Sequence, residues 1–114
     1  MSGTPTRWDR TIYRGTDHAW RLRRVLKADG TPIIPTAAEA QIRLNTQSDE
    51  VWAQLDVAID PATGWITLSL PAAATEGPEW DDRILGLWDV EVVTGGTRLR
   101  WAQGKVHVDH GVTQ

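Results

Sequence analysis

Apolar and polar residues alternate over short stretches of this sequence, and turn residues separate one stretch from the next. Successive side chains of a β-strand point to opposite faces, so such alternation indicates strands with one buried face. No stretch keeps the period of an amphipathic helix. The 114 residues fit one domain, 1–114, and contain no cysteine, which excludes a disulfide. We expect an all-β fold: a single immunoglobulin-like antiparallel β-sandwich of about seven strands.

The turn at Asp60–Gly64 predicts the register of one hairpin. Pro61 suits a fixed negative φ and Gly64 a positive φ, as in a four-residue loop built on a type I turn. If Asp60 faces Trp65, the apolar residues of both strands share one face. They form the pairs Ile59–Ile66, Val57–Leu68 and Leu55–Leu70. A slip by one residue would mix the two faces, which supports this register.

Gly95–Gly96 predicts a second hairpin, because glycine supplies the positive φ angles of a two-residue turn. The expected pairs are Thr94–Thr97, Val92–Leu99, Val90–Trp101 and, on the outer face, Glu91–Arg100. Leu85, Leu87 and Val93 also fall on the outer face. Val106 and Val108 have the wrong parity to continue the buried face, so we expect a β-bulge near Gly104.

The remaining segments are assigned from the same signals. Residues 1–13 are expected to form an N-terminal arm or edge strand, with the strand itself at 7–13. A strand at 18–27 would bury Trp20, Leu22 and Leu26, and a further strand would bury Ala40, Ile42 and Leu44. Pro71–Asp82 is expected to hold one helical turn, and 110–114 a short tail.

The chain contains seven tryptophans and no phenylalanine. The predicted registers bury three of them, Trp20, Trp88 and Trp101. The other four, Trp8, Trp52, Trp65 and Trp80, are expected on outer faces or in loops. Exposed tryptophan is unfavourable unless a partner covers it, and tryptophan is the residue most enriched in interface hot spots. These four side chains are therefore predicted to bind a protein partner.

Basic residues are concentrated near the N-terminus. Residues 1–27 hold seven basic and two acidic side chains, whereas the remainder holds five basic and thirteen acidic ones. Arginine predominates, and its planar guanidinium suits fixed contacts between proteins. Arg10 and Arg14 are therefore added to the predicted partner-binding residues, the alternative being a solvated Arg-bearing strand. Nucleic acid is not expected as a partner, because the acidic remainder would repel phosphates.

Catalytic and metal-binding patterns are weak in this sequence. His107 and Asp109 share a face without a third ligand, and His18 has no serine marked as its partner. The loop at Glu76–Asp82 places four carboxylates around Trp80, which leaves open a calcium ion, a stacked sugar ring or an exposed acidic loop. We expect no enzyme, no cofactor and no bound metal. The sequence shows neither a membrane-spanning run nor a secretory signal, so cytoplasmic synthesis is expected.

Several segments together resemble a known group of proteins. They are Arg14–Asp17, His18–Leu26 leading into Ala28–Ile33, Ala40–Arg43, Gly64–Leu70, Gly86–Val92 and Gly104–Val108. Their order and spacing over residues 12–109 resemble the small β-sandwich proteins of long-tailed bacteriophages. That family includes the N-terminal domain of baseplate upper proteins and proteins encoded beside minor tail genes.

The resemblance implies a non-enzymatic structural protein of the virion, associated with the tail or baseplate. Its partners would be other phage structural proteins, including further copies of the chain in a symmetric assembly, with no membrane involved. Two alternatives stay open: a capsid decoration protein of the same fold, and a carbohydrate-binding module that stacks sugars on Trp65, Trp52 or Trp80.

Overall fold

The computed structural model describes residues 5–45, 47 and 49–111. This part of the chain contains eight β-strands and two short 3-10 helices, and no α-helix. The all-β prediction is therefore confirmed. The last three residues of the predicted tail at 110–114 and the first four of the N-terminal arm lie outside the described residues. The elements are β1 (Thr6–Arg7), β2 (Arg10–Tyr13), β3 (His18–Leu22), β4 (Ala37–Arg43), β5 (Val51–Ile59), β6 (Ile66–Leu70), η1 (Ala72–Thr75), η2 (Pro78–Trp80), β7 (Leu85–Thr94) and β8 (Thr97–Asp109).

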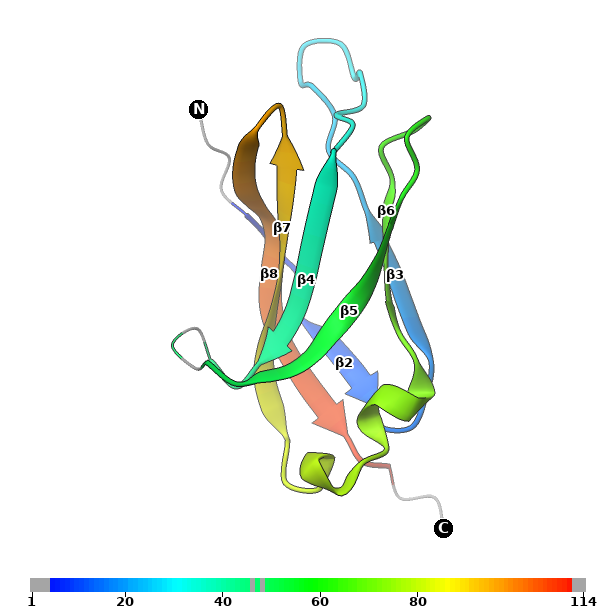
Figure 1. The fold of residues 1–114 in the computed structure, drawn as a ribbon, viewed down its shortest axis with the longest axis vertical. Coiled ribbons are helices and arrows are strands. Elements are labelled where there is room, and N and C mark those ends of the chain that lie inside the picture. The colour runs from blue at the N-terminus through cyan, green and yellow to red at the C-terminus, as the bar shows by residue number, and fades with distance from the viewer. Residues whose placement is uncertain (1–4, 46, 48, 112–114) are drawn as a thin grey trace.

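The strands form one continuous curled sheet in the order β1-β8-β7-β4-β5-β6-β3, and β2 also pairs with β8 (Figure 1). The long strand β5 makes the connection, because its first half pairs with β4 and its second half with β6. The curl brings β3 opposite β7, where the rings of Trp20 and Trp88 meet edge to face with centroids 5.7 Å apart. A single sheet thus supplies both walls of the core, and division into two sandwich sheets remains a prediction.

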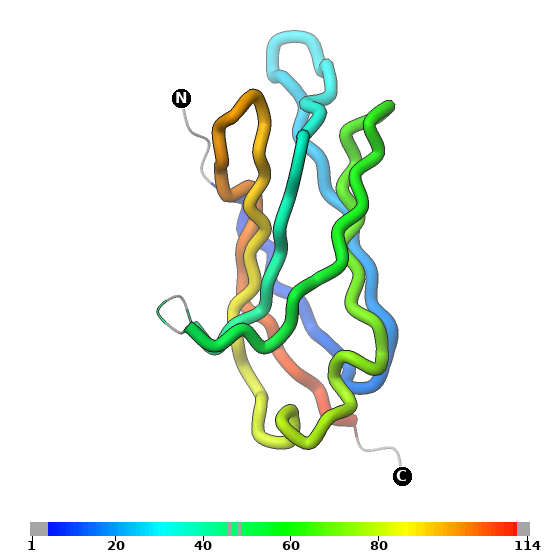
Figure 2. Tube along the Cα trace, viewed as in Figure 1, coloured from blue at the N-terminus to red at the C-terminus, as the bar shows by residue number. Residues whose placement is uncertain are grey.

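The N-terminal segment departs from the predicted antiparallel arrangement. Both β1 and β2 pair with β8 in parallel. Figure 2 shows the blue N-terminal segment running beside the red C-terminal strand. The edge strand expected at 7–13 exists, but it is interrupted at Trp8 and Asp9, where no strand is assigned.

The middle hairpin has the predicted register near its turn. Ile59 pairs with Ile66 and Val57 pairs with Leu68. The backbone N–H of Asp60 donates to the oxygen of Trp65 at 2.8 Å. Farther from the turn the prediction is wrong: Leu55 pairs with Ala40 of β4, not with Leu70, because β5 has already changed partners.

The last hairpin has the predicted turn pairs Thr94–Thr97, Val92–Leu99 and Glu91–Arg100, but Val90 pairs with Ala102 instead of Trp101. The register shift lies between Val90 and Glu91, so the bulge is at Trp101 and not near Gly104. The bulge turns the consecutive residues Trp101 and Ala102 into the core and gives Val106 and Val108 their inward phase. Arg24 donates to the backbone oxygen of Trp101 at 3.0 Å.

Two predicted strands end earlier than expected. β3 ends at Leu22, and the chain then forms a loop in which Val25 bridges Pro32 and Leu26 N donates to the oxygen of Thr31. Leu26 is consequently 49% exposed, and its predicted burial is wrong. β4 ends at Arg43, so Leu44 is also exposed rather than buried. The helical turn expected within 71–82 is present as η1 and η2.

Candidate functional site

Arginine side chains lie over most of the tryptophan rings. The guanidinium carbon of Arg10 lies 4.5 Å from the ring centroid of Trp8 and 4.9 Å from that of Trp20. A cation over an aromatic face is attracted by the electron density of the ring, more strongly where water is excluded. The Arg10 Nε atom is buried and makes no hydrogen bond with a described residue, and burial lowers the pKa of this guanidinium. Partly buried Arg10 and Trp8 thus make contacts within the chain, and these contacts hold the N-terminal segment to β3.

Arg14, also predicted to bind a partner, connects the turn before β3 to the loop between η1 and η2. Its Nε donates to the oxygen of Thr75 at 2.9 Å, and its Nη2 donates to the oxygen of Gly77 at 2.8 Å. The same Nη2 lies 2.8 Å from Asp81 Oδ1 in an ion pair. Because its donors are used within the chain, Arg14 positions the acidic loop.

Trp80 is only 1% exposed, so its predicted position in an outward-facing loop is wrong. The turn η2 directs its ring inward, against Trp52 at a centroid distance of 5.8 Å. Arg83 lies 4.7 Å from the Trp80 ring and 5.0 Å from the Trp52 ring. A Cβ at Gly86 would lie 2.6 Å from the Trp52 ring, so this glycine leaves the room that Trp52 occupies. Neither ring forms an open stacking platform for a sugar.

Trp65 is the predicted outward tryptophan that does lie on an outer face. Its ring is half-buried, with the guanidinium carbon of Arg21 at 4.4 Å and that of Arg23 at 4.7 Å from the centroid. Both arginines are exposed and make no ion pair with another described residue. Of the predicted contact residues, Trp65 therefore keeps the position that the sequence assigned to it.

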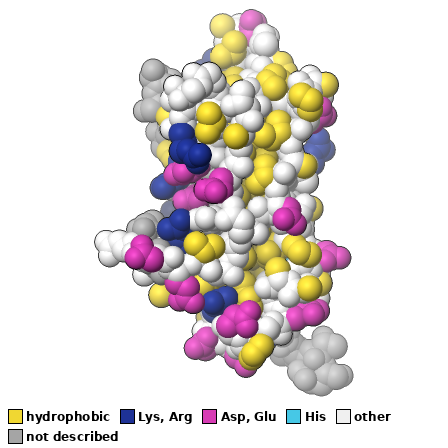
Figure 3. Space-filling view, viewed as in Figure 1, with side chains coloured by type: hydrophobic (Ala, Val, Ile, Leu, Met, Phe, Trp, Pro, Cys, Tyr) yellow, Lys and Arg dark blue, Asp and Glu magenta, His cyan; other side chains and the backbone are white. Residues whose placement is uncertain are grey.

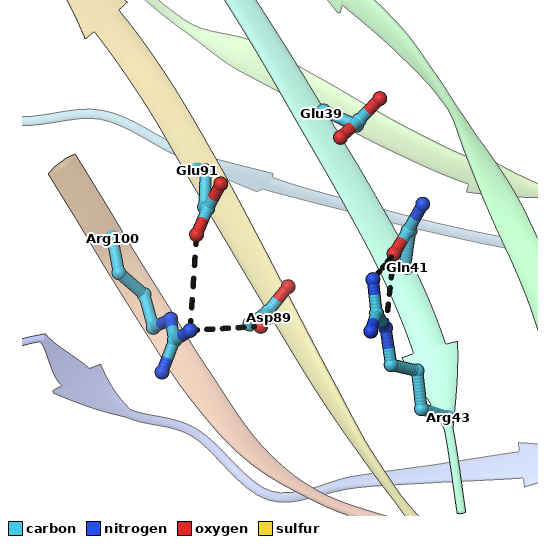
Figure 4. A pocket seen from close by; sticks show the side chains of 6 residues that line it. All are labelled: Glu39, Gln41, Arg43, Asp89, Glu91 and Arg100. Atoms are coloured by element: carbon cyan, nitrogen blue, oxygen red, sulfur yellow. Dashed lines mark hydrogen bonds and ion pairs between the residues drawn. The ribbon is translucent and has the colours of Figure 1, made fainter. Parts of the chain in front are cut away.

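A polar hollow of about 210 Å³ lies on the outer face of β4, β7 and β8, lined by Glu39, Gln41, Arg43, Asp89, Glu91 and Arg100 (Figure 4). Figure 3 shows basic and acidic side chains gathered on this face of the molecule. Arg100 Nη2 lies 3.5 Å from Asp89 and 3.7 Å from Glu91. Glu39 is directly opposite Glu91 in the sheet, an arrangement that is unfavourable for like charges.

Asp89, which lines this hollow, has a displaced pKa. Burial raises its pKa and nearby Glu91 adds to the rise, against the opposing effect of Arg100. Raised carboxyl pKa values occur at catalytic sites, where the acid acts on a bound substrate. Here Arg100 pairs with both Asp89 and Glu91, and Arg98 also pairs with Glu91, so these charges form a network of ion pairs with Glu39 beside it.

No group of three or more His, Cys, Asp or Glu side chains within the described ranges is arranged to hold a metal ion. His107 and Asp109 are both exposed on β8, and His110 Nε2 donates to the backbone oxygen of Arg83 at 2.7 Å. The part of the chain that the structure describes also contains no helix long and apolar enough to cross a membrane.

Exposed apolar side chains gather where β4 ends and where β5 and β7 begin. Arg43, the last residue of β4, pairs with Val51 on one side and with Leu87 on the other. Leu44 follows Arg43, and Ile84 and Leu85 lead into Leu87, so these strand ends are adjacent. Ile84 is 60% exposed and Leu85 49%. We call Leu44, Val51, Ile84 and Leu85 the apolar end. The alternation of residues along the strand predicted that Leu85 faces outward. The early end of β4, which exposes Leu44, has no clear signal in the sequence.

Comparison with known proteins gives no matching family model and no match to a curated protein.

Proposed function

We propose that this chain is a non-enzymatic structural protein of a long-tailed bacteriophage particle, associated with the tail or baseplate, that docks onto other virion subunits. The resemblance of residues 12–109 to small phage β-sandwich proteins supports the virion setting. The observation that supports docking is the apolar end, because large hydrophobic side chains grouped on a surface favour contact with another protein.

The docking surface in this proposal differs from the one that the sequence suggested. Trp80 is buried, while Arg10 and Arg14 are used in internal contacts, so their substitution would disturb the fold as well as any interface. The apolar end instead presents side chains whose removal leaves the core intact. The charged hollow lies farther along β4 and β7, so polar side chains accompany the apolar ones, as at the margin of a protein interface.

The test is incorporation of a double variant, Ile84→Ser/Leu85→Ser, into particles produced in the bacterial host with no wild-type copy present. We expect a folded, soluble chain with the thermal stability of the wild type and a loss of incorporation of tenfold or more, since removing interface anchors acts mainly on dissociation. Immunodetection on purified particles measures the amount bound.

A matched control comes from the loop between β3 and β4. Leu26 has the same exposed fraction as Leu85, 49%, and Ile34 is exposed nearby in sequence. The variant Leu26→Ser/Ile34→Ser should be incorporated normally. Equal incorporation of both double variants would contradict the proposed docking surface, and absence of the wild-type chain from particles would contradict the virion role.

A further inference from the structure

Charge is distributed unequally along the long axis of the molecule, which measures 50 Å. The β5–β6 turn and the loop between β3 and β4 lie at one end, and η1 and η2 lie at the other (Figure 1). Segments 21–36 and 60–65, near the first end, hold four basic and two acidic side chains. Segments 14–18 and 71–83, at the second end, hold two basic and five acidic ones. The ends therefore differ in sign by formal charge, +2 against −3.

The basic end carries an organised pair of cations. Arg21 and Arg23 are both held against the ring of Trp65, which limits their freedom before any partner arrives. Arg23 Nη1 also donates to the backbone oxygen of Thr63 at 3.3 Å. Preorganised guanidinium groups lose less entropy on binding a carboxylate than freely moving ones. The half-buried indole adds apolar area beside the two charges.

The two carboxylates at this end are occupied by their own turns. Asp29 Oδ1 accepts from the backbone N–H of Thr31 at 2.9 Å, and Asp60 Oδ1 accepts from that of Ala62 at 2.9 Å. Neither lies within ion-pair distance of Arg21 or Arg23 within the described residues, although Arg21 helps the turn's own hydrogen bonds, first that from Ala62, to lower the pKa of Asp60. The arginine pair is therefore available to carboxylates from outside the chain.

The acidic end offers those carboxylates in a fixed loop. Arg14 and buried Trp80 anchor the loop, and the ion pair with Arg14 uses Asp81. Glu76, Glu79 and Asp82 remain exposed and make no ion pair with a described residue. Complementary fields of this kind speed encounter and fix orientation between two proteins.

We propose that the Arg21–Trp65–Arg23 cluster of one molecule binds the Glu76–Asp82 loop of a second copy of the same chain, head to tail. Such a contact joins two different surfaces, so it continues from copy to copy into a ring or a filament. Its residues are distinct from those of the apolar end and the charged hollow, although Asp82 lies only two residues before Ile84 in the chain.

The test uses two charge-reversal variants of the full chain, Arg21→Glu/Arg23→Glu and Glu79→Lys/Asp82→Lys. Sedimentation velocity of the wild type should show concentration-dependent association at low salt that is lost at high salt, because exposed charges are screened. In each variant alone, both ends of the molecule carry charge of the same sign. Its copies should therefore associate at least ~10-fold more weakly than those of the wild type. An equimolar mixture should recover association, since each end then meets an end of opposite sign.

A matched control reverses two arginines away from this cluster. The variant Arg7→Glu/Arg98→Glu changes the net charge by the same amount as Arg21→Glu/Arg23→Glu, and should associate like the wild type. Circular dichroism verifies that every variant is folded. A wild-type chain that stays monomeric at low salt would overturn the proposal, and so would a mixture that associates no better than its separate components. Failure of the apolar-end variants to alter incorporation would leave this result untouched.

Discussion

The indole Nε1 of Trp88 donates a hydrogen bond of 2.6 Å to the backbone oxygen of Trp8. Trp88 is in the core on β7, and Trp8 lies between β1 and β2. Two further bonds hold the same stretch: Trp8 N donates to Gln103 O at 2.8 Å, and Lys105 N donates to Asp9 Oδ1 at 2.8 Å. The interruption in the edge strand is thus a specific attachment point, and the backbone at Trp8 satisfies a buried indole donor.

Gly104 makes this attachment sterically feasible. A Cβ at this position would lie closer to the carbonyl group of Trp8 than van der Waals contact allows. Because the clashing atoms belong to the backbone, they cannot move away by a side-chain rotation. We expect Gly104→Ala to lower the free energy of unfolding by about 1–3 kcal/mol and to speed amide exchange at residues 6–13, measured by hydrogen–deuterium exchange.

Gly30→Ala is the control for this change, because a Cβ there would meet no atom of the described residues within 4 Å, although φ is positive. It should cost stability through backbone strain alone and leave exchange at residues 6–13 unchanged. Wild-type exchange rates in Gly104→Ala would show that the N-terminal segment is attached by other means.

Arg10 is expected to act on stability through its two ring contacts. Arg10→Ala removes the cation between Trp8 and Trp20 and should destabilise the fold by about 1–2 kcal/mol in urea denaturation. Arg10→Lys should restore only part of the loss, since an ammonium group cannot stack as a guanidinium does. If Arg10→Ala unfolded like the wild type yet failed to enter particles, the partner-binding role predicted from the sequence would regain support.

The two tryptophans Trp80 and Trp65 should respond differently to truncation. Trp80→Ala empties a fully buried site and should cost about 3–5 kcal/mol in unfolding free energy. Trp65→Ala removes a half-buried ring from an outer face and should cost ~1 kcal/mol. Equal losses measured by chemical denaturation would contradict the burial difference between them.

Asp89 provides a dependence of stability on pH. Its pKa is raised above 3.8, first by burial, so the folded state holds the proton more tightly than the unfolded chain. Ionisation of Asp89 therefore disfavours folding at neutral pH, and this penalty disappears as the pH falls through the raised pKa towards 3.8. Asp89→Asn cannot ionise and lacks this contribution.

The thermal midpoints of wild type and Asp89→Asn, measured from neutral pH to about pH 4, test this sign. The midpoint of Asp89→Asn relative to that of the wild type should be highest at neutral pH and should fall as the pH is lowered. Asp109→Asn, which replaces an exposed carboxyl on β8, is the control. The opposite trend would mean that the ion pair with Arg100 outweighs burial.

The sequence predicted the features that depend on neighbouring strands and their turns. The Asp60–Gly64 and Gly95–Gly96 turns determine local pairing, so Ile59–Ile66 and Val92–Leu99 were found correctly. The prediction was wrong where pairing depends on distant segments. Leu55 changes to β4, and the bulge moves to Trp101. The parity of Val106 required a bulge somewhere in β8 but did not determine its position.

The candidate site was harder to predict, because alternation tells which face a residue occupies and not what covers that face. Trp80 lies outside any strand, so the alternation of residues along strands does not predict whether it is buried. It is η2 that buries its side chain. Arg10 is predicted from the sequence to bind a partner, whereas its position against two rings depends on contact between β2 and β3 across the core. Trp65 was placed correctly because the hairpin register alone decides its face.

The parallel pairing of β1 and β2 with β8 has a consequence for synthesis in the cell. Thr6 pairs with Ala102 and Tyr13 with Asp109, so β1 and β2 leave the ribosome long before β8, the strand that they pair with, has been synthesised. Until β8 emerges, the N-terminal segment has no pairing strand and Trp8 stays uncovered. A ribosome that stalled before residue 102 would therefore leave β1 and β2 without the strand that they pair with.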